Sequence, residues 1–142
     1  MQAEPVQAAP TGFAAAQSRG PYTTLNGPVY RATAEGDLRS GIYVLDRHCN
    51  GMGFMHGGMI SSFADGALAW AVWDVTGRSS VTLKLTMTFL ETVRPGTWLE
   101  AHPKVQSVHD GVVQVDARLL LNGTQLAARA DAVFRTLRRA AK

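Results

Sequence analysis

The stretch that decides the fold is His56-Gly57-Gly58 followed by Met-Ile-Ser-Ser-Phe-Ala-Asp-Gly-Ala-Leu-Ala-Trp-Ala-Val-Trp, residues 59–73. At about 15 residues this apolar run is too long for a typical strand, and its Ala, Leu and Met content favours a helix. Because the run is apolar almost all the way round, it predicts a central helix buried on every side rather than a surface helix.

Beyond this helix the hydrophobic pattern changes to alternation. Residues 81–89 alternate apolar and polar side chains, which predicts a half-buried strand. Its apolar face would carry Val81, Leu83, Leu85, Met87 and Phe89. Three more strands are expected at 98–108, 112–121 and 124–137, with hairpin turns at Asp110-Gly111 and Asn122-Gly123. Pro103 lies inside the first of these three, which predicts an edge position or a bulge there.

The part before the helix is expected to hold a leader, a strand and a loop. Residues 1–20 are rich in Ala, Gln and Pro and predict a flexible low-complexity leader, either frayed or with a short helix at 13–17. Residues 41–46 predict a strand, and 50–54 form a loop because of their glycines. Residues 21–142 then make a single domain of the α+β class, in which the sheet wraps around the helix.

Composition narrows the classes of partner. The net charge of +3 suits an anionic partner, yet no basic-aromatic pattern or helix-turn-helix supports nucleic acid. A single cysteine, Cys49, excludes an internal disulfide and suits a reducing compartment. There is no signal-peptide pattern and no apolar span of about 20 residues, so the sequence predicts a cytoplasmic protein that does not enter a membrane.

Asp65 is the first candidate for chemistry, since it is the only charged side chain between His56 and Trp73. An ionised carboxylate inside an enclosed helix is costly unless it is paired or functional, and such carboxylates are candidates for active sites. The alternative places Asp65 on one solvent-exposed polar stripe of the helix beside Ser61, Ser62 and Asp74. The spacing alone leaves both interpretations open.

The start of the helix is the second candidate. Glycines at Gly57 and Gly58 allow close approach to the backbone, and amides at a helix N-terminus can bind an anion or a developing oxyanion. An ordinary flexible start of a helix explains the glycines equally well. His56 could act in acid–base chemistry, orient another group or simply pack. Since His56 and Asp65 lie nine residues apart, about 13.5 Å along a helix, a shared site requires Gly57 of one chain to face Asp65 of another.

Other polar residues carry weaker signals. Asn50 could orient a carbonyl or a water, although turn-forming asparagines are more common. The hydroxyl of Thr82 could hold a water, and Cys49 lacks the histidine–carboxylate support of a nucleophile. The histidines form no spacing typical of a metal site, and the sequence has no HExxH, CxxC, P-loop, GxGxxG or GxSxG. No cofactor and no metal are therefore expected.

Taken together, the spacing His48-x-Asn50-x-x-Gly53-x-x-His56-Gly57-Gly58, then six residues and Asp65, resembles the hot-dog thioesterases of the 4-hydroxybenzoyl-CoA and phenylacetate-pathway type. The later segments 89–96, 126–128 and 133–134 resemble the family's strands and turn, so the likeness covers roughly residues 25–137. It implies the hot-dog fold, a curved antiparallel sheet around one long helix. It also implies a homodimer joined edge to edge, commonly a dimer of dimers, with acyl-CoA bound at the subunit interface.

The resemblance also implies roles for individual residues. The amide of Gly57 would bind the thioester carbonyl, and Asp65 of the facing subunit would be the general base or the nucleophile. Asn50 would position the carbonyl or the water, His56 would orient the site, and Thr82 would help to hold the water. The expected activity is hydrolysis of a small, medium or aromatic acyl-CoA. The alternatives are a non-catalytic acyl-CoA-binding protein and, with less support in the motifs, a hot-dog dehydratase.

Overall fold

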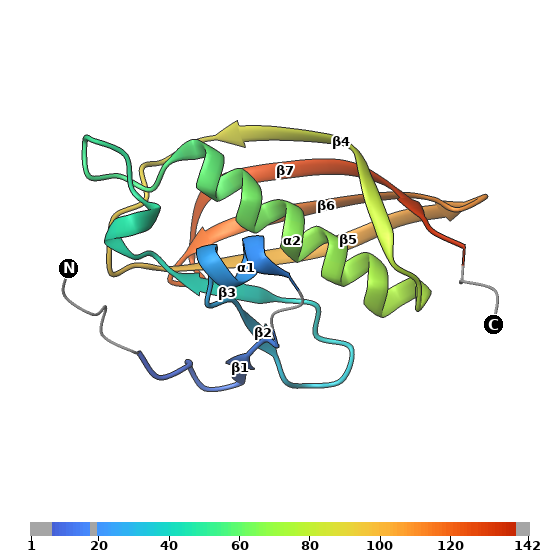
Figure 1. Cartoon of the computed structure of the whole chain (residues 1–142), viewed down its shortest axis with the longest axis horizontal. Coiled ribbons are helices and arrows are strands. Elements are labelled where there is room, and N and C mark those ends of the chain that lie inside the picture. Colours follow the sequence, from blue (N-terminus) through green and yellow to red (C-terminus); the bar gives the residue numbers. More distant parts are fainter. Residues whose placement is uncertain (1–6, 18–19, 139–142) are drawn as a thin grey trace.

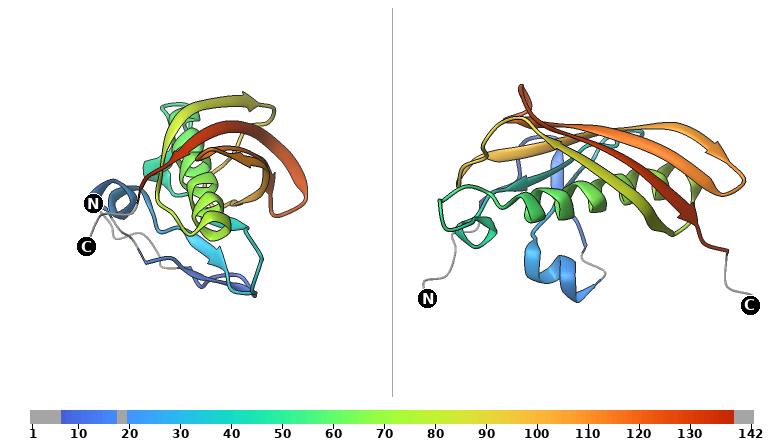
Figure 2. Two further views of the ribbon diagram at one scale, coloured as in Figure 1. Left: turned by 90° about the vertical axis from the view of Figure 1, so that its right-hand side faces the viewer. Right: turned by 90° about the horizontal axis from the view of Figure 1, so that it is seen from above.

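The structure is a computed structural model that describes residues 7–17 and 20–138. One seven-stranded antiparallel sheet curves around the long helix α2 (Gly57–Thr76), as Figures 1 and 2 show. The strand order is β1-β2-β3-β5-β6-β7-β4. The arrangement confirms the predicted α+β class, with a curved sheet wrapped around a central helix.

From β3 onward the elements follow the predicted order along the chain, whereas β1, α1 and β2 were not predicted. The sheet consists of β1 (Phe13–Ala15), β2 (Tyr30–Ala32), β3 (Ser40–Tyr43), β4 (Ser80–Phe89), β5 (Trp98–His109), β6 (Val112–Leu121) and β7 (Gln125–Thr136). The short helix α1 (Pro21–Asn26) precedes β2, and the 3₁₀ turn η1 (Asp46–His48) follows β3. The predicted strand at 41–46 is thus confirmed in its first part, and its last residue begins η1. Among the described residues, no helix is long and apolar enough to cross a membrane.

Helix α2 buries one face rather than all of its surface. The face toward the sheet is made of Ile60, Phe63, Ala64, Ala67, Leu68, Ala71 and Val72, which are all buried. On the other side Gly58 and Gly66 are exposed, and Trp73 is 39% exposed. The prediction of burial on every side is therefore wrong for the single chain. The physical reason is that the sheet curves around only one side of the helix, so apolar residues on the opposite side, such as Trp73, have no strand to pack against.

A β-bulge in β4 changes which residues face the helix. Thr82 pairs with Phe134 but Lys84 pairs with Val133, so Leu83 is an extra residue in the ladder. After it Leu85 and Met87 pack against the core, as the alternation predicts, whereas Phe89 at the end of the strand is 51% exposed, contrary to the prediction. Before the bulge, Thr82 is the residue whose side chain points toward the helix. Val81 and Leu83 are exposed instead of lining the predicted apolar face, because one extra residue moves the alternation to the opposite side of the strand.

The hairpins that join β5, β6 and β7 agree with the sequence, but the four strands from 81 to 137 do not form one meander, because β4 pairs with β7 at the edge of the sheet rather than with β5. Asp110 and Asn122 have positive φ values of 48° and 51°, and each is followed by a glycine that also has positive φ. Asp110-Gly111 forms a two-residue hairpin loop between His109 and Val112, whereas the loop at Asn122-Gly123 has three residues because it includes Thr124. Pro103 pairs with Ala117 of β6, but β3 accompanies β5 only over Trp98 to Ala101. Pro103 therefore lies where one side of β5 is a free edge, which confirms the prediction for this proline.

The structure corrects the prediction of a short helix at 13–17. Phe13–Ala15 forms β1, which pairs with β2 at the end of the sheet. The ring of Phe13 packs edge-on against Trp98 at 5.2 Å between ring centres. These contacts are distant in the sequence, so local composition did not indicate them. The rest of the predicted leader includes residues 1–6 and 18–19, which lie outside the described residues.

Candidate active site at α2 and β4

The start of α2 presents one unsatisfied amide. His56 is the N-cap, and its Nδ1 accepts a hydrogen bond of 2.8 Å from the Gly58 N–H. The His56 carbonyl accepts from the N–H groups of Met59 and Ile60, at 2.8 and 3.0 Å. The Gly57 N–H has no partner in the part of the chain that the structure describes. This amide, at the positive end of the helix dipole, can donate to a carbonyl or an oxyanion.

Positions 57 and 58 are glycine for different structural reasons. A Cβ on Gly58 would lie 2.9 Å from the His56 Nδ1, so the histidine cap needs a glycine at this position. A Cβ on Gly57 would lie 3.5 Å from the Phe89 ring, an ordinary contact. Packing therefore does not require glycine at 57. Its missing side chain leaves the free amide open beside Phe89.

Asp65 lies in the middle of α2 and is half-buried. The Thr82 hydroxyl donates a hydrogen bond of 2.6 Å to Asp65 Oδ1. Within the described chain no cation pairs with Asp65, and its Oδ2 has no hydrogen-bond partner. The β4 bulge makes this contact, because it turns Thr82 toward the helix. The site therefore holds a carboxylate that is oriented on one oxygen and free on the other.

The single chain does not bring Asp65 and Gly57 together. They are eight residues apart on one continuous helix, which corresponds to a rise of about 12 Å. Within one chain, these predicted site residues therefore lie in two separate groups. One is the pair Asp65 and Thr82, and the other is His56 with the glycines at the helix start.

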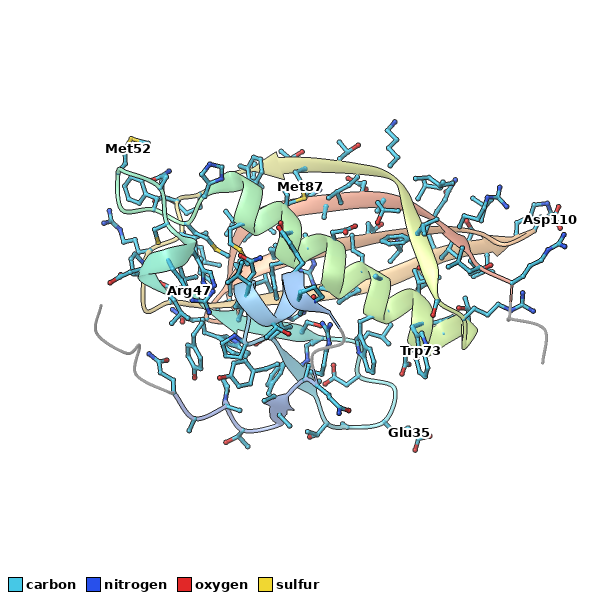
Figure 3. All side chains as sticks on the ribbon, in the orientation of Figure 1. Glu35, Arg47, Met52, Trp73, Met87 and Asp110 are labelled. Carbon is cyan, nitrogen blue, oxygen red and sulfur yellow. The ribbon has the colours of Figure 1, made fainter. Side chains whose placement is uncertain are left out.

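Asn50 builds the loop that leads into α2. Its side-chain oxygen accepts from the N–H groups of Met52 and Phe54, at 3.0 and 3.2 Å. Figure 3 shows Met52 at the outer tip of this loop. The geometry matches the turn-forming alternative for Asn50. Its side-chain NH₂ group has no partner among the described residues and remains available as a donor.

His48 positions the same loop, a role that the sequence analysis did not assign. It is only 2% exposed, its Nδ1 accepts from the Leu45 N–H at 3.0 Å, and its Nε2 donates to the Asn26 carbonyl at 2.7 Å. Its own carbonyl accepts from the His56 N–H at 2.9 Å, which ties it to the helix cap. In the sequence, the only feature that pointed to this role of His48 is its position eight residues before His56.

Cys49 has the surroundings of an inert thiol. Burial, reinforced by the charge of Asp46, raises the pKa of the Cys49 thiol. A raised pKa lowers the fraction of reactive thiolate at neutral pH. Among the described residues no three His, Cys, Asp or Glu side chains gather in a way that could hold a metal ion.

The outer edge of β4 is open. This strand pairs with β7 on one side only. Four apolar side chains on it and just after it are about half exposed: Val81, Leu83, Phe89 and Leu90. An unpaired edge with exposed apolar side chains is typical of a surface that meets another chain.

Comparison with known proteins decides the family. Residues 52–128 match the model of the thioesterase superfamily. The chain belongs to this superfamily. A protein of Pseudomonas aeruginosa that is named as a candidate esterase is 33% identical over 128 residues, which cover 88% of this chain and 95% of that protein.

Solved structures share the fold. The PaaI protein of E. coli, from the phenylacetic acid degradation operon, has a TM-score of 0.67 at 23% identity over 70% of this chain and 72% of that one. A hypothetical thioesterase of Streptococcus pneumoniae, solved with coenzyme A, has a TM-score of 0.68 at 16% identity over 72% and 82%. The superfamily member described here therefore has the hot-dog fold that the resemblance implied.

Proposed function

We propose that this protein is an acyl-CoA thioesterase that hydrolyses a small, medium or aromatic acyl-CoA to the free acid and CoA. Membership of the thioesterase superfamily and the fold shared with a coenzyme A-bound thioesterase support this proposal. The observation that carries it is Asp65, a carboxylate in the middle of α2 that is held on one oxygen by Thr82 and free on the other.

The proposed active site is shared by two subunits. A two-fold contact along the open edge of β4 would cover the exposed apolar side chains of this strand and bring the two α2 helices close together. Gly57 of one subunit would then face Asp65 of the partner subunit, so each dimer would have two sites. A dimer of such dimers is the larger assembly that we expect from the resemblance.

In this site each residue has one role. The Gly57 N–H donates to the thioester oxygen and stabilises the negative charge that develops there. Asp65 of the partner subunit either removes a proton from the attacking water or attacks the carbonyl carbon itself, and water then completes the hydrolysis. In both routes one water is consumed, and the CoA sulfur leaves as the thiol. Thr82 orients Asp65, His56 holds the start of the helix, and the Asn50 NH₂ group is available to position the carbonyl or the water.

Two variants test the two halves of the site in a thiol-release assay. Asp65→Asn removes the carboxylate charge, and Gly57→Pro removes the amide hydrogen and puts the proline ring in its place. Proline is tolerated at a first helical position, and the His56 angles of φ −62° and ψ 135° are those that a following proline requires. We expect a loss of about 10²–10³-fold in kcat for Gly57→Pro. Gly57→Ala keeps the N–H and is the matched control.

Mixing the two inactive variants distinguishes a shared site from a site within one chain. After subunits exchange, a heterodimer of Asp65→Asn and Gly57→Pro contains one site with both groups intact. We expect recovery of about a quarter of the wild-type activity, because half of the dimers are mixed and each has one of two sites. No recovery despite verified exchange would contradict the shared site. Tight acyl-CoA binding without thiol release across many substrates would favour the non-catalytic alternative.

A further inference from the structure

The outer face of the sheet, which points away from α2, carries two adjacent rows of like charge. Asp116 of β6 lies directly opposite Asp131 of β7, and these two residues form the acidic row. At the next level along the same strands Arg118 lies directly opposite Arg129, and these two form the basic row. The residues that alternate with them are buried in the core, so all four charged side chains belong to the outer face.

Each row places two like charges directly opposite each other, an arrangement that destabilises a pair of strands. Within the described chain no residue of either row forms an ion pair. Lys104 of β5 stands opposite Asp116 without forming one, and the Asp116 Oδ2 accepts a hydrogen bond of 2.7 Å from Gln106 instead. The four charges are therefore available to groups outside the chain.

A hollow of about 300 Å³ opens on the same face beside the acidic row. Both aspartates line it, together with Lys84, Gln114 and Val133, whereas the two arginines do not. No described element covers this face, because the sheet curves over α2 with its other side (Figure 2). The face thus presents a recess with acidic walls and, next to it, two long basic side chains.

The two rows make the face complementary to itself. The buried pair Ala117 and Ala130 lies midway between the rows. A two-fold axis that crosses the strands above this pair, in the plane between two packed sheets, sets the acidic row of each copy opposite the basic row of the other. Sheets that pack face to face keep their strand directions within about 30°, so rows only two strands wide stay aligned.

The same pattern selects the kind of partner. A partner of one charge would attract one row and repel the other, and juxtaposed like charges oppose binding. A second copy of this chain satisfies both rows at once, because it brings the basic row to the acidic one and the reverse. Arginine and aspartate also pair well, since a planar guanidinium can donate two parallel hydrogen bonds to a carboxylate.

We propose that the outer face of the sheet is a two-fold interface with a second copy of this chain, in which each acidic row meets the basic row of the other copy. The hollow beside the acidic row receives the arginine side chains of that copy. This surface lies on the opposite face of the sheet from α2 and Asp65, so it is distinct from the contact proposed at the edge of β4. The two contacts together join four chains.

Charge reversal with mixing tests the interface. The acidic-row variant is Asp116→Arg with Asp131→Arg, and the basic-row variant is Arg118→Asp with Arg129→Asp. By sedimentation velocity at low salt we expect the wild-type protein to have the mass of four chains and each variant alone to have half of it, because like charges then meet across the interface. An equimolar mixture of the two variants should recover the wild-type mass, since every charge again meets its opposite.

The matched control is Glu35→Arg with Asp74→Arg, which reverses two exposed carboxylates that do not lie on the sheet. It changes the net charge as much as the acidic-row variant does and should keep the wild-type mass. Dissociation of the control but of neither row variant would place the contact on the side of α2 and overturn the proposal.

The remaining outcomes distinguish this interface from the dimer proposed at β4. A mass that is the same in the wild-type protein and both row variants overturns the interface and leaves the β4 dimer standing. If the β4 contact is absent instead, the wild-type mass is that of two chains, and it falls to one chain in each row variant. No recovery in a mixture of two folded variants also overturns the pairing of the rows.

A neutral variant decides if a reversed one does not fold. Asp116→Asn with Asp131→Asn relieves the repulsion within the chain and removes the attraction between copies. We expect its association on this face to require at least about tenfold more protein than that of the wild type. An unchanged dependence of mass on protein concentration would overturn the interface.

Discussion

Two carboxylates of this protein are withdrawn from water but have opposite surroundings. Glu100, on β5, is 7% exposed and accepts hydrogen bonds from Trp98 at 2.8 Å, His102 at 2.8 Å and Arg39 at 3.2 Å. Asp65, on α2, accepts one hydrogen bond, from Thr82, within the described chain. A buried carboxylate whose oxygens accept several hydrogen bonds, such as Glu100, serves the structure. A carboxylate with one free oxygen, such as Asp65, remains available for chemistry.

The surroundings of Glu100 also set its charge. Burial raises the pKa of Glu100, but the hydrogen bonds from Trp98 and His102 and the charges of His102 and Arg39 prevail and hold it below its ordinary value. The carboxylate thus remains ionised in the folded protein and links β5 to the segment before β3. A saturated carboxylate of this kind is expected to affect stability and not the reaction.

The largest expected effect comes from Asp65→Asn. Since the variant removes the charge of the proposed base or nucleophile and keeps the shape, we expect kcat/KM to fall by about 10³-fold or more. The free energy of unfolding should change by less than about 0.5 kcal/mol, because one oxygen keeps its hydrogen bond from Thr82. Thiol release and urea unfolding measure the two quantities. Full activity would remove Asp65 from the mechanism.

The opposite result is expected for Glu100→Gln. The neutral amide weakens the hydrogen bonds from Arg39 and His102, so the free energy of unfolding should fall by about 1–3 kcal/mol. Activity per folded molecule should not change, because Glu100 does not contact the proposed site residues. Glu35→Gln, in the exposed loop between β2 and β3 that Figure 3 labels, is the control and should match the wild type. A selective loss of activity in Glu100→Gln would break the comparison.

The pH dependence of stability sharpens the same contrast. The pKa of Glu100 is lower in the folded protein than in the unfolded chain, so its contribution is complete above the unfolded value of about 4.3. That contribution is lost as the pH falls through the folded pKa. The stability difference between wild type and Glu100→Gln should therefore be largest near neutral pH and shrink below about pH 4. Urea unfolding across this range measures it, and a difference that stays constant would contradict the assignment.

The smallest effect is expected at Thr82. Thr82→Val keeps the shape but removes the hydroxyl that donates to Asp65, so kcat should fall by about tenfold, which corresponds to one hydrogen bond to a charged group. Thr82→Ser keeps the hydroxyl and should remain within about threefold of the wild type. Thiol-release kinetics distinguish the two variants. If both lose activity equally, the methyl group and not the hydroxyl supports Asp65.

Much of the fold and part of the site could be predicted from local patterns. The apolar run at 59–73, the alternation at 81–89 and the Asp-Gly and Asn-Gly pairs each report short-range preferences of the backbone, and each produced the expected element. The spacing from Asn50 to Asp65 likewise indicated the family before any contact was known. Its catalytic roles remain predictions, because they depend on a second chain.

The tertiary structure alone decided the rest. The bulge that turns Thr82 toward Asp65 depends on pairing with β7, and a small pocket lined by Arg31 exists because α1, β2 and α2 meet. A repeating pattern specifies which face of a strand or helix is apolar, but not where an inserted residue reverses that face. Nor does it specify which distant segment covers the side of α2 that faces away from the sheet. Those contacts form between residues that only folding brings together.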